Sequence, residues 1–343
     1  MQRFISYLKI VGVGTVAVLL IVFSENVAAS VVHSIRVCVS SMIPSMFAVM
    51  AISTYILSKG YDRVIFRPLC FLLRPFFRLD RDTLSVFLLS LIGGYPLGIK
   101  LLKERISQNK NYSAIAEHAS VFCYCISPPF AVNMIGVGIY GSAEIGGIVY
   151  LSNALSCILL AAVYSRFFRS DPGYVPKDRD AGLVFDVSSA ANALFTVCTI
   201  LIAFNAALEA VRSLLAIFSV SIDPLLSGAF EISNLLSLDR PSLALLPWIS
   251  AISAFGGICV IFQCFAICGN AFSLKKFLIG RLISAILSAG ICHILLYLFS
   301  PALPASAQSG TLYRFSTDRG VWVLLVLMAM IFFEKNKKIF KKG

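Results

Sequence analysis

Single polar side chains that stand alone within apolar stretches are the residues of this chain best suited to chemistry. Glu231, in LLSGAFEISNLLSL, is the strongest isolated acid. A carboxylate in such surroundings can bind a coupling ion such as H⁺ or Na⁺, carry a proton or accept a hydrogen bond from a solute. Gln263 and Asn133 carry amides that can orient a polar heteroatom. Each also has a structural interpretation, because Glu231 can lie at an interface and the amides can join neighbouring helices.

Lys100 directly follows a glycine- and proline-rich interruption and could add positive charge beside an anion. It could equally anchor its loop at a membrane surface. The residues that we predict to contact a small-molecule substrate lie in and around two interrupted stretches. They are Gly93, Gly94, Tyr95, Pro96, Gly98, Lys100, Ser127, Asn133, Glu231, Asn234, Gly256, Gly257 and Gln263.

Catalytic chemistry finds little support in the sequence. The predicted spans contain no Asp, the chain has no HEXXH or GXXXXGK[ST] motif, and His33, His118 and His293 are widely separated. Cys264 and Cys268 share a helix face, but two thiols without further ligands make a poor zinc site. We therefore expect no enzyme, catalytic residue, metal, cofactor or disulfide.

The element that must position Lys100 is the stretch from Leu84 to Lys100. Its apolar part, Leu84–Ile92, would form roughly 13 Å of helix, whereas a bilayer core is about 30 Å thick. Gly93, Gly94, Pro96 and Gly98 then follow within six residues. Such residues free backbone groups that lipid cannot satisfy, so a break at membrane depth must be buried in protein or face a wet cavity. In carriers, broken helices mark the substrate site, and we expect a re-entrant element here.

A second interruption, AISAFGGICVIFQ, contains Gly256 and Gly257 and is followed by Gln263. Gly256 comes 163 positions after Gly93, close to half of the chain. An aromatic–Ser pair opens a new helix soon after each interruption, at Tyr112-Ser113 and Phe272-Ser273. Glycine also promotes close packing in membrane helices, but two pairs at matching places favour two related halves, which are typically inverted in transporters.

Composition establishes the class. The 343 residues are 58% hydrophobic and 13% charged, with a mean hydropathy of +0.87. Soluble domains carry about 25% charged residues, and several stretches longer than 18 residues here lack charge, so we predict an all-α, polytopic membrane protein in contact with the lipid bilayer. Alternating segments of the kind that form barrels are absent from the sequence.

The spans are predicted at 8–23, 33–57, 113–134, 144–165, 188–218 and 277–299, within a total of six to eight plus two re-entrant pieces. Residues 1–169 form the first membrane half, 170–186 a polar linker, and 187–300 the second half. Residues 301–343 comprise a loop, a terminal span and a basic tail. The segment 59–81 should form amphipathic interfacial pieces, and we expect the first span to remain uncleaved.

The net charge of +12 would suggest nucleic acid in a soluble protein. Here the basic residues lie in short loops between spans, where positive charge sets the orientation of the spans in the membrane. We therefore expect no nucleic-acid partner. The basic segments 59–81 and 334–343 place both termini on the cytoplasmic side of a bacterial membrane. The sequence leaves a homo-oligomer open.

The segments IGGYPLGIKLLKERI, SPPFAVNMIGVGIYG, FEISNLL and AFGGICVIFQ together resemble the YlbJ-type sporulation integral membrane proteins with nucleoside-recognition (Gate) domains. The likeness covers most of residues 30–300, and Gly-Tyr-Pro-x-Gly-x-Lys is its most specific part. It implies a nucleoside-carrier-like architecture, an endospore-forming bacterium, and dipicolinate movement into the forespore. The matched positions are Gly94, Tyr95, Pro96, Gly98, Lys100, Gly136, Glu231, Gly256, Gly257 and Gln263.

The chain departs from the family where Leu97 and Ile99 replace smaller residues and where Cys125 and Ile126 replace polar ones. The expectation is a sporulation-associated transporter of a small polar or anionic metabolite, dipicolinate-like or nucleoside-like, in the cytoplasmic or forespore-surrounding membrane. The alternative is a non-transporting structural or signalling membrane component of sporulation. Uptake by the purified protein in liposomes separates the two.

Overall fold

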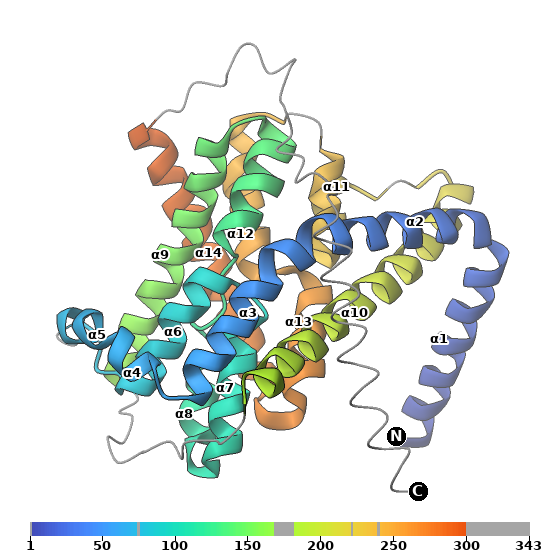
Figure 1. Cartoon of the computed structure of the whole chain (residues 1–343). Helices are drawn as coiled ribbons and strands as arrows, with labels where there is room; N and C mark the ends of the chain where they lie inside the picture. Colours follow the sequence, from blue (N-terminus) through green and yellow to red (C-terminus); the bar gives the residue numbers. More distant parts are fainter. Residues whose placement is uncertain (1, 74–75, 168–181, 221, 239–240, 300–343) are drawn as a thin grey trace, which may run out of the picture.

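The computed structural model describes residues 2–73, 76–167, 182–220, 222–238 and 241–299. Every regular element among them is helical (Figure 1), which confirms the all-α class. Five helical segments are long and apolar enough to cross a membrane: Ser24–Ser58, Ala143–Phe167, Leu183–Ile217, Leu243–Cys268 and Leu274–Phe299. The chain is therefore a multi-pass membrane protein by length and composition. The predicted terminal span and tail lie outside the described residues.

The N-terminal part consists of α1 (Gln2–Val22), of which Gly12–Val22 is a shorter apolar stretch, and of one long segment. That segment comprises α2 (Ser24–Val37), a π-helical turn (Cys38–Met42) and α3 (Ile43–Ser58). Proline at position 44 cannot donate to the preceding turn, and the widened turn lies directly before it. Pro44 thus accounts for the irregular turn within this long segment.

Two short helices follow, α4 (Asp62–Ile65) and α5 (Arg67–Leu73). Their large apolar side chains are exposed, Val64 at 73% and Phe71 at 82%, while Arg63 pairs with Asp82. Exposed aromatic and basic residues on short helices fit the predicted interfacial segment.

The first interruption separates α6 (Arg81–Gly93) from α7 (Leu97–Gln108), as expected. Asp80 caps α6 by accepting a hydrogen bond from the Thr83 amide at 3.0 Å. The loop between the two helices contains a cis peptide bond between Tyr95 and Pro96.

The predicted span 113–134 is wrong. After a 3₁₀ turn (Lys110–Tyr112), α8 runs only from Ser113 to Ala119, and the chain is non-helical up to Ser127. A π-helical segment (Phe130–Tyr140) follows, and α9 (Ala143–Phe167) is the next span. We call residues 120–127 the crossing segment. The chain becomes helical again only after Ser127, eight residues beyond the end of α8.

The second half begins with α10 (Leu183–Ile217), which starts within the predicted linker; residues 168–181 lie outside the described residues. Then come α11 (Pro224–Phe230) and 3₁₀ turns at Ile232–Ser237 and Leu243–Leu245. The second interruption separates α12 (Leu246–Phe255) from α13 (Gly257–Cys268), and a 3₁₀ turn (Gly269–Ala271) precedes α14 (Leu274–Phe299). As predicted, 225–238 contains no helix long enough to cross.

Two groups of helices form the core. α14 packs against α9 and α12, and α9 packs against the π-helical segment. α10 crosses diagonally over α3 and contacts α2 and α13 (Figure 1). α7 packs against both α6 and α13. Gly93, Gly94, Gly256 and Gly257 are all buried, so both interruptions are enclosed by protein.

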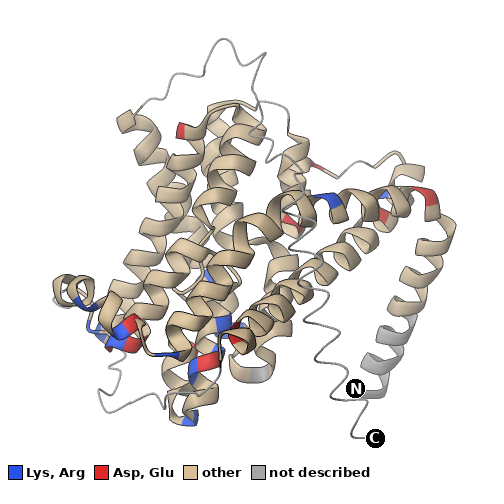
Figure 2. Cartoon of the chain, viewed as in Figure 1, with Lys and Arg blue, Asp and Glu red and all other residues tan. Residues whose placement is uncertain are grey.

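Charged side chains gather at one end of the helices, around α4, α6 and α7 (Figure 2). Arg105, completely buried, donates to Asp62 at 2.7 Å and lies 3.6 Å from Asp82. Asp82 in turn pairs with Arg63 at 3.0 Å. This ionic cluster joins the three helices at what we call the charged end. Burial is the main influence on the pKa of the Asp62 carboxyl group and raises it, against the opposing charge of Arg105.

Candidate functional site

The two interruptions meet at the crossing segment. Gly94 has a φ of +74°, a conformation that favours glycine, and a Cβ added there would lie 2.5 Å from the Ser127 amide nitrogen. The neighbouring Tyr95 amide donates to the Cys125 carbonyl at 2.7 Å. The non-helical backbone of the crossing segment therefore supplies the partner that the first break lacks.

The second interruption packs against Tyr124 of the same segment. Gly256 has a φ of +89°, and a Cβ there would lie 2.7 Å from Cζ of Tyr124 and closer still to its hydroxyl. Tyr124 also stacks on Tyr95 with ring centroids 4.7 Å apart, and the Tyr95 hydroxyl donates to the Ser253 carbonyl at 3.4 Å. These contacts join the two interruptions through two tyrosine rings.

A buried guanidinium completes the stack. Arg281 of α14 lies with its Cζ 4.5 Å from the Tyr124 ring centroid and 5.6 Å from that of Phe277. Its Nη1 donates to the Tyr124 carbonyl at 2.8 Å, while Nε and Nη2 have no hydrogen-bond partner among the described residues. It is fully buried, and no described acidic group forms an ion pair with it. An intramembrane charge without a counter-charge is costly and marks a functional position.

On the other side of Tyr95 lies a small enclosed space, the central cavity. Its volume of about 20 Å³ admits about one water molecule. The polar groups around it come from Tyr95, Ser127, Glu231, Ser233 and Gln263. The remaining lining residues are Val37, Met42, Met46, Phe130, Leu201, Ile232 and Val260. The cavity thus lies where the first break, the crossing segment, the α11 connection and α13 come together.

Glu231 is 1% exposed and caps the 3₁₀ turn that follows it. Its Oε1 accepts from the Ser233 amide at 3.2 Å, whereas Oε2 has no hydrogen-bond partner among the described groups. The Cys259 thiol lies beside the carboxyl group. Capping accounts for one oxygen and leaves the other unexplained.

Gln263 links α13 to α10, since its Nε2 donates to the Val197 carbonyl at 3.3 Å. Its Oε1 is buried and, within the described part of the chain, accepts no hydrogen bond. The central cavity is therefore lined by two residues that each carry an unpartnered, acceptor-only oxygen. Buried acceptors of this kind cost about 1–3 kcal/mol each when unsatisfied, so a missing partner is implied.

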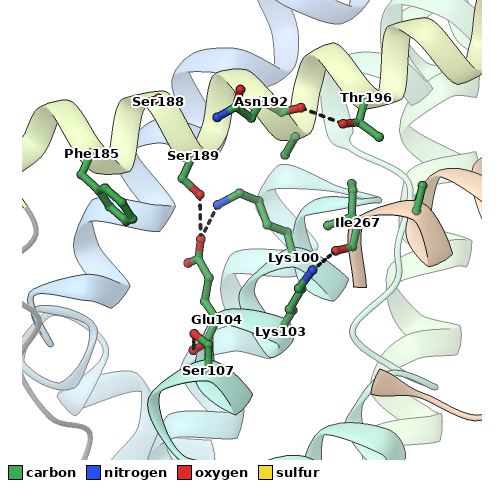
Figure 3. A pocket seen from close by; sticks show the side chains of 12 residues that line it. Lys100, Lys103, Glu104, Ser107, Phe185, Ser188, Ser189, Asn192, Thr196 and Ile267 are labelled. Carbon is green, nitrogen blue, oxygen red and sulfur yellow. Dashed lines mark hydrogen bonds and ion pairs between the residues drawn. The ribbon is translucent and has the colours of Figure 1, made fainter. Parts of the chain in front are cut away.

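A larger polar pocket of about 350 Å³ lies towards the charged end, between α7, α10 and α13. Lys100 and Ser189 both donate to Glu104 there (Figure 3). Lys100 also donates to Thr54 of α3 at 2.7 Å, and Lys103 donates to the Ile267 carbonyl at the end of α13. Thr196, which precedes Val197 on α10, lines this pocket. Ala266, which lies about one helical turn after Gln263 on α13, lines it as well. The Gln263–Val197 bond therefore joins residues that neighbour the lining of the polar pocket, and Gln263 itself lines the central cavity.

No protein-family model, curated protein or solved structure matches this chain. The assignment of a function rests on the residues themselves.

The structure brings together only part of the predicted substrate site. Tyr95, Ser127, Glu231 and Gln263 line the central cavity. The other predicted residues of the two breaks lie outside the cavity lining: Gly93, Gly94, Pro96, Gly98, Gly256 and Gly257. Lys100 lies in the polar pocket, where Glu104 neutralises it. Asn133 is exposed on the π-helical segment, and Asn234 lies on the 3₁₀ turn outside the cavity lining. Gly136 packs against Gly146 of α9.

Arg281 is the residue that the sequence analysis missed. It lies inside α14 and is buried. The signal was present in FLIGRLISAIL, where it is the one charge in an apolar stretch.

The described residues offer no cluster of three or more His, Cys, Asp or Glu side chains that could hold a metal ion. All ten cysteines are buried and free. The arrangement suits reversible binding of a polar ligand by hydrogen bonds and charge.

Proposed function

We propose that this protein is a membrane transporter of a small polar or anionic metabolite. The observation that carries the proposal is the meeting of two broken helices at an enclosed polar cavity within an otherwise apolar bundle. A soluble function would not require backbone breaks inside a membrane, and a simple anchor would not require them to converge.

The buried charges favour an anion. Arg281 has free donors and no acidic counter-charge in the described chain, so a carboxylate or phosphate group of the solute would neutralise it. Tyr124 contacts both Arg281 and Tyr95, and Tyr95 lines the cavity, where it offers an aromatic group to a planar ring. Of the solutes that the family resemblance implies, a dipicolinate-like solute combines these features, whereas a nucleoside-like solute supplies the planar ring without the anionic group.

The central cavity in this conformation is too small for such a solute, so transport requires an opening. We infer that the polar pocket is the entrance, because its volume suits a small ligand and its lining on α10 and α13 neighbours the Gln263–Val197 bond beside the cavity. By the basic-loop rule, the charged end with this pocket faces the cytoplasm. Each half contains a 35-residue helical segment, then a glycine break, then a span of 25 or 26 residues. The 35-residue segments are Ser24–Ser58 and Leu183–Ile217, and the spans are Ala143–Phe167 and Leu274–Phe299. Two related halves would account for this recurrence.

Uptake into liposomes tests the proposal. The purified chain should accumulate pyridine-2,6-dicarboxylate or a nucleoside, and Glu231→Gln or Gly94→Leu should abolish accumulation. Arg281→Met should reduce uptake of the dicarboxylate about ten- to a hundredfold, since a charge-assisted hydrogen bond contributes about 1.5–3 kcal/mol. The same variant should be as stable as the wild type or more so, because it removes an uncompensated buried charge.

Gly147→Ala is the matched control, because a Cβ at Gly147 meets nothing within 4 Å. Equal behaviour of empty and protein-containing liposomes, or of wild type and Glu231→Gln, would remove the transport proposal. The small cavity volume would then support the alternative, a non-transporting structural or signalling component of sporulation.

A further inference from the structure

We propose that the central cavity is a binding site for one monovalent metal cation, Na⁺. The inference concerns what occupies the cavity at equilibrium, and it deepens the proposed transport function by naming a ligand for the same site. It would stand even if no solute were carried, because cation binding is measured without transport.

The first step is the kind of atom that lacks a partner. Glu231 Oε2 and Gln263 Oε1 are both buried and unpartnered among the described groups, and neither can donate a hydrogen bond when the carboxyl group is ionised. Ser127, Ser233 and Tyr95 also line the cavity, and each carries a hydroxyl oxygen. A set of carboxylate, amide and hydroxyl oxygens is the ligand type that hard cations prefer.

The second step is charge. Glu231 is the one charged residue in the cavity lining, and no described basic side chain forms an ion pair with it. A single positive charge neutralises it, whereas a divalent cation would leave a net charge buried in a medium of low dielectric constant. This argument selects a monovalent ion over Mg²⁺ or Ca²⁺.

The third step is size and access. The cavity has room for about one water-sized particle and lies against α3, α10 and α13, where Gln263 is linked to Val197. Bare Na⁺ and K⁺ are both no larger than a water molecule, but the few oxygen-bearing groups of the lining suit Na⁺ better than K⁺, which takes more ligands. Met42 and Met46 also line the cavity, and their sulfur atoms suit soft cations. A soft cation bound through sulfur alone would leave both unpartnered oxygens without a ligand, so a hard cation fits the cavity better.

Thermal unfolding of the purified full-length protein in detergent tests the assignment. NaCl is titrated against choline chloride at constant ionic strength, with KCl and MgCl₂ in parallel. The wild-type Tm should rise with log[NaCl], by about 5 °C at a hundredfold excess over Kd. KCl should give a smaller rise, and MgCl₂ should give none beyond the choline reference.

Glu231→Gln should remove the Na⁺-dependent shift, since its amide retains an oxygen to cap the 3₁₀ turn but carries no charge. Gln263→Met should raise the NaCl concentration needed for half the shift by about tenfold or more, the effect of losing one ligand. Glu144→Gln, at an exposed acid in the first turn of α9, should keep the full shift.

Direct binding of ²²Na⁺ to the wild type should reach one ion per chain, and unlabelled NaCl should displace it. Because this measurement uses the wild type alone, it tests the proposal even if a variant does not fold. An unchanged Tm in NaCl and choline chloride together with no ²²Na⁺ binding would overturn the proposal and leave a protonated carboxyl group beside water. A shift that persists in Glu231→Gln would place the ion elsewhere and would also refute the assignment.

Discussion

Replacing Gly256 by alanine tests whether the second helix break is required by packing. Gly256 adopts a φ of +89°, where a side chain costs about 1–2 kcal/mol. The added Cβ would also lie 2.7 Å from Cζ and 2.9 Å from Cε1 of Tyr124. That ring cannot retreat, because Tyr95 stacks on it and Arg281 lies over it. Overpacking of this kind costs about 1–3 kcal/mol, so Gly256→Ala should lower the free energy of unfolding by about 2–5 kcal/mol.

The assay is equilibrium unfolding in mixed micelles, with Tyr124→Phe as the second arm of a double-mutant cycle. The Tyr124 hydroxyl has no hydrogen-bond partner among the described residues, so Tyr124→Phe alone should cost little. In that background Gly256→Ala should cost less, since the atom nearest to the new methyl group is gone. The backbone contribution should remain.

Gly147→Ala provides the comparison, because Gly147 lies in regular helix with open space at its Cβ position and should be neutral or gain about 0.5–1 kcal/mol. If Gly256→Ala were as stable as the wild type, or if its cost were unchanged by Tyr124→Phe, the described contact between the break and the tyrosine stack would be refuted.

Three further outcomes follow from the charged end and from α8. Arg105→Met should destabilise the protein by about 3–5 kcal/mol in the same unfolding assay, because it removes the ion-pair partner of the buried Asp62 carboxylate, whereas Asp82 keeps its pair with Arg63; a neutral effect would refute the ionic cluster. Desolvation, and to a lesser extent the charge of Lys276, lowers the pKa of His118, whereas Glu117 opposes the shift. The stability that the neutral His118 side chain contributes is therefore present above about pH 6.5 and is lost as the pH falls through the pKa of the folded state. The wild-type Tm should therefore decline from pH 6.5 to 5, and His118→Gln should flatten the decline; parallel profiles would contradict this. Glu117→Gln should cost less than 1 kcal/mol, because its pair with Lys276 is largely exposed, and a cost of several kcal/mol would show that the pair is buried.

The helix breaks could be predicted from the sequence because glycine and proline act locally. A φ of +74° at Gly94 needs no knowledge of distant residues, and the same holds at Gly256. The isolated acid Glu231 and amide Gln263 were recognisable because their neighbours are apolar. Their convergence on one cavity was not, since it depends on contacts between segments far apart in the chain.

The crossing segment shows why the rest could not be predicted. Its sequence, SVFCYCIS, is as apolar as a membrane helix. It stays non-helical because its carbonyl groups are used elsewhere: Cys125 accepts from the Tyr95 amide, and Tyr124 accepts from Arg281 and the Cys157 thiol. Tertiary hydrogen bonds here outweigh local propensity, and Arg281 escaped notice because its partner is a backbone atom without a sequence signature.

Because all ten cysteines are buried, their reactivity reports how often the protein opens. Cys123 and Cys125 belong to the crossing segment, and Cys259 lies beside Glu231. A small maleimide can reach these sulfur atoms only while the bundle is parted. The rate of cysteine alkylation in the wild-type protein should therefore increase with the population of the open conformation. A ligand that stabilises the closed conformation should lower this rate, and no engineered label is needed.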